Sequence, residues 1–580
     1  MSRTIRSGRP PNVVIVITDD QGIGDLSCMG NPWLKTPELD RFASEALSLT
    51  DFHAAPLCTP TRGMLMTGRA PLRNGAWATA WGRSILDHDE VTMAETFRKS
   101  GYRTGMFGKW HLGDAYPYRP QDRGFEKVVA HKGGGVGGTP DFWGNDYFDD
   151  TYFRNDRPES FEGYCTDVWF DEAMAFIRDS ANAPFFAYIA TNAPHVPYFV
   201  ADKYAEPYRA NPEIAEPEFY GMIANIDENF GRLLQTLREL EIEDDTIIIF
   251  TTDNGSSGGA EVDAEERVQS GFNAGYRGKK GSYYEGGHRV PFFVRYPNGG
   301  ITADRRGGLA SMMDVFPTLI DLCDLETPRV QFDGMSLKPQ ICDGAPPDRD
   351  RVLIQQNQQS QVPPAAWDYC AMSDNWRLVR GRELYDVDAD PGQTRDVAAD
   401  HPDVVDRLAA AHDRFWSEVS ANLDTPLPLW VGHDEQTVER LDAMDVAGDI
   451  AWDQAQVLEL LRTSGRWRVR FVEPGQYRLR LRRWPTELGL PLSAVPQLTE
   501  DERRSFVRYR MHGVPKPLRP AFAEIAFGSR GWRCAVDSES EEVTFEVRAE
   551  AQEVVLDAVF VDASGERFGA YYVYVERLTG

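Results

Sequence analysis

Three short, nearly continuous runs of apolar residues stand out in the first half of the chain. They cover residues 13–18 (VVIVIT), 185–190 (FFAYIA) and 246–251 (TIIIFT), and they are rich in β-branched and aromatic side chains. Such runs are typical of strands buried on both faces of a parallel sheet. Helix-like stretches lie between them, at 91–100 and 219–240. The pattern predicts an α/β fold with a large mixed, mostly parallel sheet flanked by helices.

The pattern changes about two thirds of the way along the chain. Two short apolar runs, 376–380 and 383–387, are joined at a glycine and are followed by a predicted helix at about 402–420. Two short strands around a glycine turn are typical of an antiparallel pair. We therefore predict a catalytic domain over 11–425 that ends in a small antiparallel subdomain at about 350–425.

Beyond Pro426 and Pro428, apolar residues alternate with charged ones. Residues 467–471 and 477–481 show this alternation, and a Pro-Gly turn separates them. A period of two is typical of strands with one buried face and one exposed face. We predict a β-rich accessory domain of the sandwich type over 430–580.

Composition and charge narrow the range of partners. The chain has 580 residues, of which 42% are hydrophobic, and a formal net charge of -28. Nucleic acids and anionic membranes bind basic surfaces, so this charge argues against both as partners. No run approaches the ~18 apolar residues of a membrane-spanning helix. Assembly into a homo-oligomer stays open.

The cysteines and the N-terminus bear on the cellular compartment. The seven cysteines are odd in number and widely spread, which fits a reducing compartment better than a disulfide scaffold. Residues 1–11 are positively charged but contain no apolar stretch, so they do not resemble a secretory signal. We expect a cytoplasmic protein, or a periplasmic or secreted one if a leader was removed.

Two pairs of polar residues follow predicted strands. Asp19 and Asp20 come directly after the first strand, and Asp253 and Asn254 come after the strand at 246–251. Ligands of α/β sheets bind at the carboxyl ends of strands, so the two pairs are expected to converge. Oxygen ligands suit a hard divalent cation such as Ca²⁺ or Mg²⁺. The alternative is helix or turn capping, where Asp and Asn are also common.

Cys58 begins a third polar segment. Residues 58–62 read Cys-Thr-Pro-Thr-Arg, and a helix-like run follows at 63–67. A helix that begins here would direct free amide groups toward an anion near Cys58, and Arg62 would add a bidentate donor for sulfate or phosphate oxygens. Taken alone, such a cysteine is more often a buried free thiol than a nucleophile.

The segment around Cys58 belongs to a wider set of motifs. Together with Thr-Gly-Arg at 67–69, it resembles the signature of the formylglycine-dependent type I sulfatases of the alkaline phosphatase superfamily. The remaining motifs resemble those of the family in the same order along the chain: 108–113 (GKWHLG), 193–197 (APHVP), 277–281 (RGKKG) and 285–291 (EGGHRVP). The resemblance covers about residues 11–420 and implies an alkaline-phosphatase-like sandwich fold.

The resemblance implies a modified cysteine and a metal. In this family the cysteine is oxidised to formylglycine (3-oxoalanine) by a formylglycine-generating or equivalent maturation enzyme, and the hydrated aldehyde attacks sulfur. We expect Ca²⁺ as the single divalent cation, with Mg²⁺ and Mn²⁺ as alternatives. The implied metal ligands are Asp19, Asp20, converted Cys58, Asp253 and Asn254.

The resemblance also implies roles for the other motif residues. His111 would deprotonate the second hydroxyl of the hydrated aldehyde, and His195 and Lys280 are candidates to protonate the departing alcohol. Arg62 and Lys109 would offset the charge of the sulfuryl oxygens. The implied catalytic set is Cys58, Arg62, Lys109, His111, His195 and Lys280.

Two positions depart from the family pattern. Lys279 stands where relatives usually have glycine, so the lysine role is assigned to Lys280 by its position before Gly281. His288 occupies a position that is usually apolar. We interpret it as a structural histidine, with a substrate contact as the alternative.

The predicted function is hydrolysis of aryl or carbohydrate sulfate monoesters to an alcohol and inorganic sulfate. The alternative enzyme is a phosphonate monoester or phosphodiester hydrolase, because these relatives share the aldehyde and much of the metal site. A non-catalytic binder of sulfated glycans is a further alternative, against which the intact set of charged residues argues. In the accessory domain, Trp467, Trp484 and Trp532 indicate either a sugar-stacking surface or a core. The glycine-rich segment 133–138 is expected to line the pocket.

Overall fold

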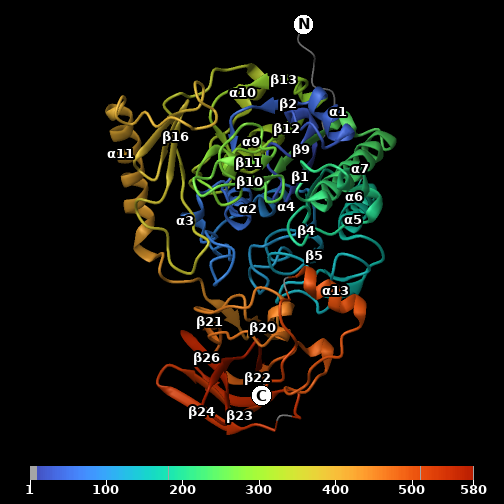
Figure 1. Cartoon of the computed structure of the whole chain (residues 1–580), viewed down its shortest axis with the longest axis vertical. Coiled ribbons are helices and arrows are strands. Elements are labelled where there is room, and N and C mark those ends of the chain that lie inside the picture. The colour runs from blue at the N-terminus through green and yellow to red at the C-terminus, as the bar shows by residue number, and fades with distance from the viewer. Residues whose placement is uncertain (1–9, 181, 510, 538, 579–580) are drawn as a thin grey trace.

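The computed structural model describes residues 10–578, except for residues 181, 510 and 538. Residues 1–9, which make up most of the segment used above to argue against a secretory signal, lie outside this part. Figure 1 shows a large upper lobe, built mainly from residues before 430, and a lower lobe of C-terminal strands. Among the described helices, none is both long and apolar enough to cross a bilayer.

One large sheet organises the upper lobe. Its central strands β9, β1, β8, β4 and β5 are parallel neighbours, and antiparallel pairs occur toward both edges. The three predicted apolar runs are β1, β8 and β9, and all of their residues are buried, as predicted. Within the described residues, the strand order is β13 (Asp304–Arg306), β2 (Leu47–Leu49), β12 (Phe292–Arg295), β9 (Thr246–Thr252), β1 (Asn12–Thr18), β8 (Phe185–Ala190), β4 (Arg103–Lys109), β5 (Lys127–His131), β6 (Thr151–Arg154) and β7 (Arg157–Ser160).

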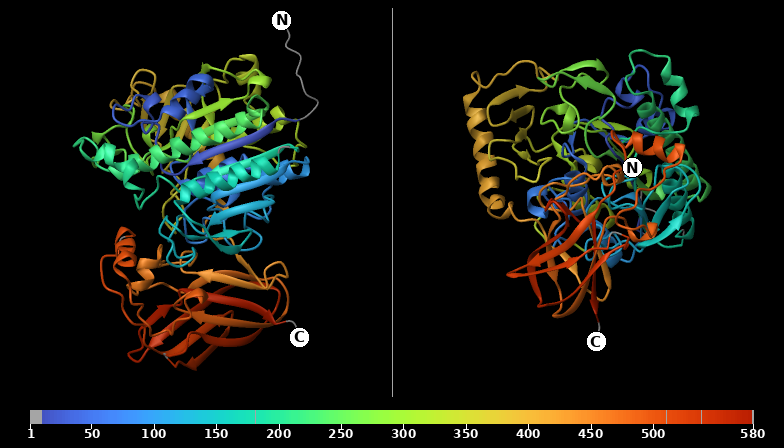
Figure 2. Two further views of the ribbon diagram at one scale, coloured as in Figure 1. Left: turned by 90° about the vertical axis from the view of Figure 1, so that its right-hand side faces the viewer. Right: turned by 60° about the horizontal axis from the view of Figure 1, so that its bottom comes forward.

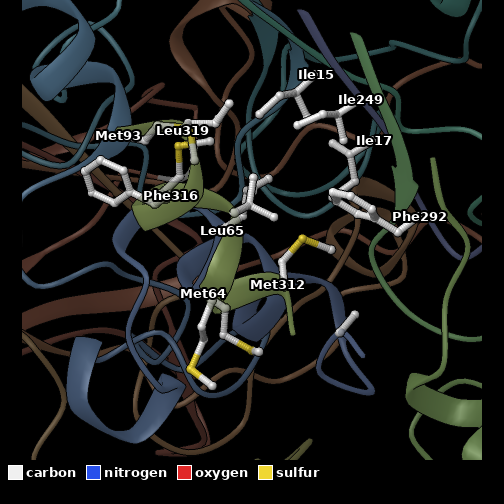
Figure 3. Packing of buried hydrophobic residues seen from close by; sticks show 14 of the residues in the cluster. Ile15, Ile17, Met64, Leu65, Met93, Ile249, Phe292, Met312, Phe316 and Leu319 are labelled. Carbon is white, nitrogen blue, oxygen red and sulfur yellow. The ribbon is translucent and has the colours of Figure 1, made fainter. Parts of the chain in front are cut away.

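Helices cover both faces of this sheet, which gives the α/β sandwich that the sequence predicts. In β1, Val14 and Val16 pack with one layer of helices, and Ile15 and Ile17 pack with the other. Figure 3 shows Ile15 and Ile17 within the second of these clusters. Successive side chains of a strand face opposite sides, so an uninterrupted apolar run is buried on both. The first layer is α1 (Pro37–Glu45), α5 (Cys165–Asp179) and α7 (Pro217–Glu239); the second is α2 (Cys58–Thr67), α4 (Met93–Lys99) and α9 (Val315–Cys323).

A separate antiparallel sheet follows the central one in the sequence. The two predicted strands are β17 and β18, and the structure adds two more strands beside them. Helix α11 (Pro402–Val419) packs against this sheet through Leu408. The strand order is β15 (Leu353–Gln355), β16 (Cys370–Ser373), β17 (Trp376–Val379) and β18 (Glu383–Asp386).

The lower lobe consists of two sheets packed face to face (Figure 2). Strands β21 and β22, which follow each other across the Pro-Gly turn, lie in different sheets and do not pair. Trp467 and Trp484 have no exposed surface, so both are core residues and neither forms a sugar-stacking surface. One sheet contains β19 (Leu429–Val431), β21 (Arg466–Phe471), β26 (Gln552–Asp562), β23 (Pro520–Phe527), β24 (Arg530–Ala535) and β27 (Arg567–Gly569); the other contains β20 (Val438–Asp442), β28 (Tyr572–Leu578), β22 (Gly475–Arg482) and β25 (Val543–Ala549).

The two lobes share a hydrophobic core. Ile85 and Tyr118 of the upper lobe belong to the same buried cluster as Leu441 of the lower lobe. The main-chain N–H of Trp81 donates to the carbonyl of Met444 over 3.0 Å, and its indole N–H donates to the carbonyl of Gly448 over 3.1 Å. The lower lobe is therefore packed directly onto the upper lobe.

Gly108 allows two central strands to approach each other closely. Its φ is 108°, and an added Cβ would overlap the carbonyl oxygen of Ala190 in the neighbouring strand. We expect Gly108→Ala to lower the free energy of unfolding by about 3 kcal/mol, measured by urea denaturation. Gly135→Ala is the control, since nothing lies within 4 Å of a Cβ there. An unchanged unfolding midpoint for Gly108→Ala would contradict this explanation.

Candidate active site

Residues far apart in the sequence meet at the carboxyl ends of the central strands. Asp19 and Asp20 follow β1, Lys109 ends β4, and Asp253 and Asn254 follow β9. All five side chains are buried. The main-chain N–H of Asp253 donates to the last carbonyl of β1 over 3.0 Å, which holds the two strand ends together.

Cys58 lies at the start of a completely buried helix. It is the first residue of α2, it is 2% exposed, and no side chain caps the amides of this helix end. Its Sγ lies 3.5 Å from Nδ1 of His111, while Nε2 of His111 lies 3.0 Å from the carbonyl of Thr79. Because a carbonyl only accepts, Nε2 carries the proton and the lone pair of Nδ1 faces the sulfur. Burial, helped by Lys109, lowers the pKa of His111 well below its ordinary value, so the ring is neutral.

Two buried ion pairs lie close to Cys58. Nζ of Lys109 donates to Asp19 over 2.7 Å, and Arg62 donates to Asp253 from Nε and a terminal nitrogen over 3.2 and 2.8 Å. Burial and the charge of Asp19 raise the pKa of Asp253 to about 7, although Arg62 opposes this. Arg62 and Lys109 have no exposed surface and are not among the residues that line the pocket.

A further ion pair flanks the pocket. Nζ of Lys280 donates to Asp20 Oδ2 over 2.7 Å, and Nε2 of His195 lies 3.6 Å from the same oxygen. Burial alone would raise the pKa of Asp20, but the charges of Lys280, His195 and Lys109 outweigh it and hold the pKa below its usual range. Burial and Lys280 lower the pKa of His195 to about 3, whereas Asp20 raises that of Lys280 against the effect of burial. At neutral pH, Lys280 is therefore charged and His195 is neutral.

The residues around Cys58 fit a divalent cation. Ligand atoms of Asp19, Cys58 and Asp253 lie within 4.8 Å of one another. Asp19 Oδ1 and Asn254 Oδ1 are buried and have no hydrogen-bond partner among the described residues. Buried oxygens without donors are what a hard cation requires. Asp20 differs, because Asn254 and Lys280 already donate to its two oxygens.

A second histidine cluster lies outside this site. Nδ1 of His288 is 2.9 Å from Nδ1 of His53, and Nε2 of His288 is 3.1 Å from the carbonyl of Tyr283. The neighbouring carboxylate of Glu285 accepts from Arg289 over 2.7 Å and from Arg377 over 2.8 Å. His288 is completely buried and does not line the pocket, which agrees with its interpretation as a structural residue.

A pocket of about 470 Å³ opens above Cys58. His111, His195 and Lys280 line it together with the glycine-rich segment 133–138, which was expected to do so. The lower lobe supplies another part of the wall, namely Met444, Trp452, Asp453, Gln456, Arg508 and Tyr509. The sequence did not predict these residues, because no motif surrounds them and their position depends on how the lobes pack.

Comparisons with known proteins identify relatives of this chain. A family model described as Sulfatase matches residues 11–325. Human N-acetylgalactosamine-6-sulfatase is 32% identical over 377 residues, which cover 59% of this chain and 67% of that protein. N-acetylgalactosamine-6-O-sulfatase from Bacteroides thetaiotaomicron is 29% identical over 493 residues, which cover 70% of this chain and 93% of that protein.

A solved structure has the same fold. The crystal structure of Ps i-CgsB in complex with k-i-k-neocarrahexaose matches with a TM-score of 0.63 and 24% sequence identity. The match covers 72% of this chain and 94% of that one. At this level of identity the likeness concerns the fold alone.

Binding of a divalent cation to the cluster around Asp253 can be tested by unfolding. A ligand that binds only the folded state stabilises it by about 2.7 kcal/mol at a hundred times its Kd. We expect Ca²⁺ to raise the unfolding temperature of the chelator-treated protein, and Asp253→Asn to abolish that rise. Asp227→Asn is a matched control, because this buried carboxylate accepts from the main-chain N–H of Leu39, away from the cluster. Equal shifts in both variants would rule out the assignment.

Proposed function

Because the chain belongs to the sulfatase family and is therefore a hydrolase of sulfate monoesters, we propose that it cleaves sulfated saccharides with Cys58, converted to formylglycine, as its nucleophile and Ca²⁺ as its metal. The position of Cys58 carries this proposal. The residue lies at the base of the pocket, at the N-terminal end of a buried helix and beside two carboxylates.

The properties of the Cys58 thiol support its conversion. Burial raises the pKa of this thiol, although Lys109 and Lys280 oppose the effect, so the unmodified side chain stays protonated at neutral pH. A protonated thiol is a poor nucleophile. The hydrated form of formylglycine would supply a nucleophilic hydroxyl and a second hydroxyl on the same carbon. The cation would supply positive charge beside them. Because Cys58 is buried within a helix, the maturation enzyme would act before the chain folds.

The neighbouring residues have complementary roles. The unprotonated Nδ1 of His111 faces the side chain at 58 and is placed to accept a proton from it. Asp19, Asp253 and Asn254 would hold the cation with Asp20 at its edge. Lys109 and Arg62, which do not line the pocket, would act by holding the two carboxylates in place.

Lys280 is the group we assign to the leaving alcohol. The departing oxygen of an alkyl sulfate is a strong base and needs a proton as the bond to sulfur breaks. Asp20 keeps Lys280 protonated at neutral pH, whereas His195 is neutral there. Lys280 would therefore donate the proton, and His195 would help to orient the substrate.

Sulfated saccharides are the substrate class that the pocket and the relatives support. The relatives reported above include sulfatases named for N-acetylgalactosamine 6-sulfate. The pocket volume of about 470 Å³ lies in the range of small-ligand sites. Lys280 on its wall places a positive charge beside the reacting group, although the net charge of the chain is -28.

Replacement of Cys58 tests the nucleophile. We expect Cys58→Ala to lose at least about 10³-fold in kcat/KM for 4-nitrophenyl sulfate, because no other side chain can take the same place. The mass of the peptide that contains residue 58 should show an aldehyde in place of the thiol. Cys165→Ala, at a buried cysteine in α5, is the control and should keep its activity. Full activity of Cys58→Ala, or faster cleavage of a 4-nitrophenyl phosphonate ester by the wild type, would refute the proposal.

Substrates with different leaving groups test Lys280. Lys280→Ala should lose about 10²- to 10⁴-fold in kcat with N-acetylgalactosamine 6-sulfate, whose alkoxide needs a proton. The loss should be much smaller with 4-nitrophenyl sulfate, because nitrophenolate leaves without one. Lys279→Ala is the matched control, since this lysine instead lies 3.5 Å from Glu261. Equal losses with both substrates, or a larger loss in Lys279→Ala, would overturn the assignment.

A further inference from the structure

One wall of the active-site pocket comes from the lower lobe. It is formed by the segment that precedes α12 (Gln454–Leu458) and by the C-terminal end of α13 (Glu500–Arg508). Figure 1 shows α13 in the region where the lower lobe faces the upper lobe. Trp452, Arg508 and Tyr509 are the members of this wall on which the following inference rests.

This wall is fixed to the catalytic lobe. The main-chain N–H of Thr139 donates to the carbonyl of Trp452 over 3.0 Å, and the side-chain amide of Gln454 donates to the carbonyl of Gly138 over 3.1 Å. The indole of Trp452 also packs edge-on against Trp81, with 5.2 Å between the ring centroids. The wall therefore keeps its position without a bound substrate.

Tyr509 of the lower lobe contacts the glycine-rich segment 133–138 of the upper lobe. An added Cβ at Gly137 would overlap the ring of Tyr509, so the glycine allows the two lobes to approach here. Tyr509 is 8% exposed, and its hydroxyl has no hydrogen-bond partner among the described residues. Because the hydroxyl itself is buried against this segment, Tyr509 can offer its ring, and not its hydroxyl, to a ligand in the pocket.

Arg508 is a cation at the same wall without a carboxylate partner among the described residues. Its guanidinium carbon lies 3.5 Å from the centroid of the Phe199 ring, which holds the side chain against the upper lobe. By contrast, Arg504 of the same helix pairs with Glu500 over 2.6 Å. A guanidinium that is stacked on a ring and has no carboxylate partner suits an anionic group of a ligand that can accept two hydrogen bonds from it.

We propose that this wall binds the alcohol part of a sulfated saccharide that carries a second anionic group, with Arg508 pairing with that group and the rings of Trp452 and Tyr509 contacting the sugar. The inference rests on the proposed function, because the reacting sulfate must lie at Cys58. The second anionic group is either another sulfate or a carboxylate, since Arg508 binds both through the same bidentate geometry. The lower lobe is then the part of the chain that selects the substrate.

Matched substrates test the role of Arg508. 4-Nitrophenyl sulfate and N-acetylgalactosamine 6-sulfate carry one anionic group. N-acetylgalactosamine 4,6-disulfate adds a sulfate, and a 6-sulfated disaccharide with a uronic acid adds a carboxylate. The wild type should prefer at least one doubly anionic substrate. Arg508→Ala should lower kcat/KM for that substrate about 10- to 100-fold, mainly through KM, and leave the singly charged substrates within about twofold.

Further variants separate this role from a structural one. Arg508→Lys should recover part of the loss, and Arg504→Ala should match the wild type. Tyr509→Phe keeps the ring against Gly137 and should match the wild type, because the hydroxyl is buried away from the pocket. A loss confined to the disulfate identifies a second sulfate, and one confined to the uronic acid identifies a carboxylate; both support the inference.

The failure of this inference differs from the failure of the proposed function. A wild type that does not cleave 4-nitrophenyl sulfate contradicts the proposed function. If that cleavage is present but the wild type shows no preference for a second anionic group, the inference alone is wrong. Equal losses with singly and doubly charged substrates in Arg508→Ala would also overturn it.

Discussion

Two buried carboxylates at the ends of β1 and β9 are the constraint on which the site depends. Asp19 and Asp253 have no exposed surface, and an unpaired charge in such a place costs several kcal/mol. Lys109 and Arg62 neutralise them over 2.7 and 2.8 Å. Arg62 belongs to α2, so its pair with Asp253 connects the helix to the sheet, while the pair of Lys109 and Asp19 connects the ends of β4 and β1. Charge compensation inside the core thereby places Cys58 at the base of the pocket.

The same arrangement reconciles an acidic protein with an anionic substrate. Lys109 and Arg62 are buried and do not line the pocket, and each of them compensates the charge of a carboxylate. Lys280 is the positive side chain of this group that lines the pocket. Oxygens of Asp19 and Asn254 remain without donors among the described residues, which leaves room for a cation. With that cation bound, positive charge would be concentrated where a sulfate must bind, while the distant acidic surface acts only weakly through solvent.

The lower lobe extends this site rather than standing apart from it. Its hydrophobic core is continuous with residues such as Ile85 and Tyr118 of the upper lobe, and this packing holds the outer wall of the pocket in place. The base of the pocket therefore contains the reacting groups, and the wall contains groups suited to the rest of the substrate. Such a division allows the wall to change between relatives without a change in the chemistry.

The sequence by itself determined the parts of the protein that depend on local patterns. The apolar runs 13–18, 185–190 and 246–251 predicted adjacent buried strands, because the period of burial along a strand is a local property. Contiguous motifs likewise identified the family and the residues around Cys58. Only the tertiary structure decided that Arg62 and Lys109 do not line the pocket, that Trp467 and Trp484 are core residues, and that Arg508 lines the pocket. Each of these depends on contacts between separate segments of the chain, such as Asp19 and Lys109, which are 90 residues apart. No local pattern in the sequence determines which side chains such packing will cover.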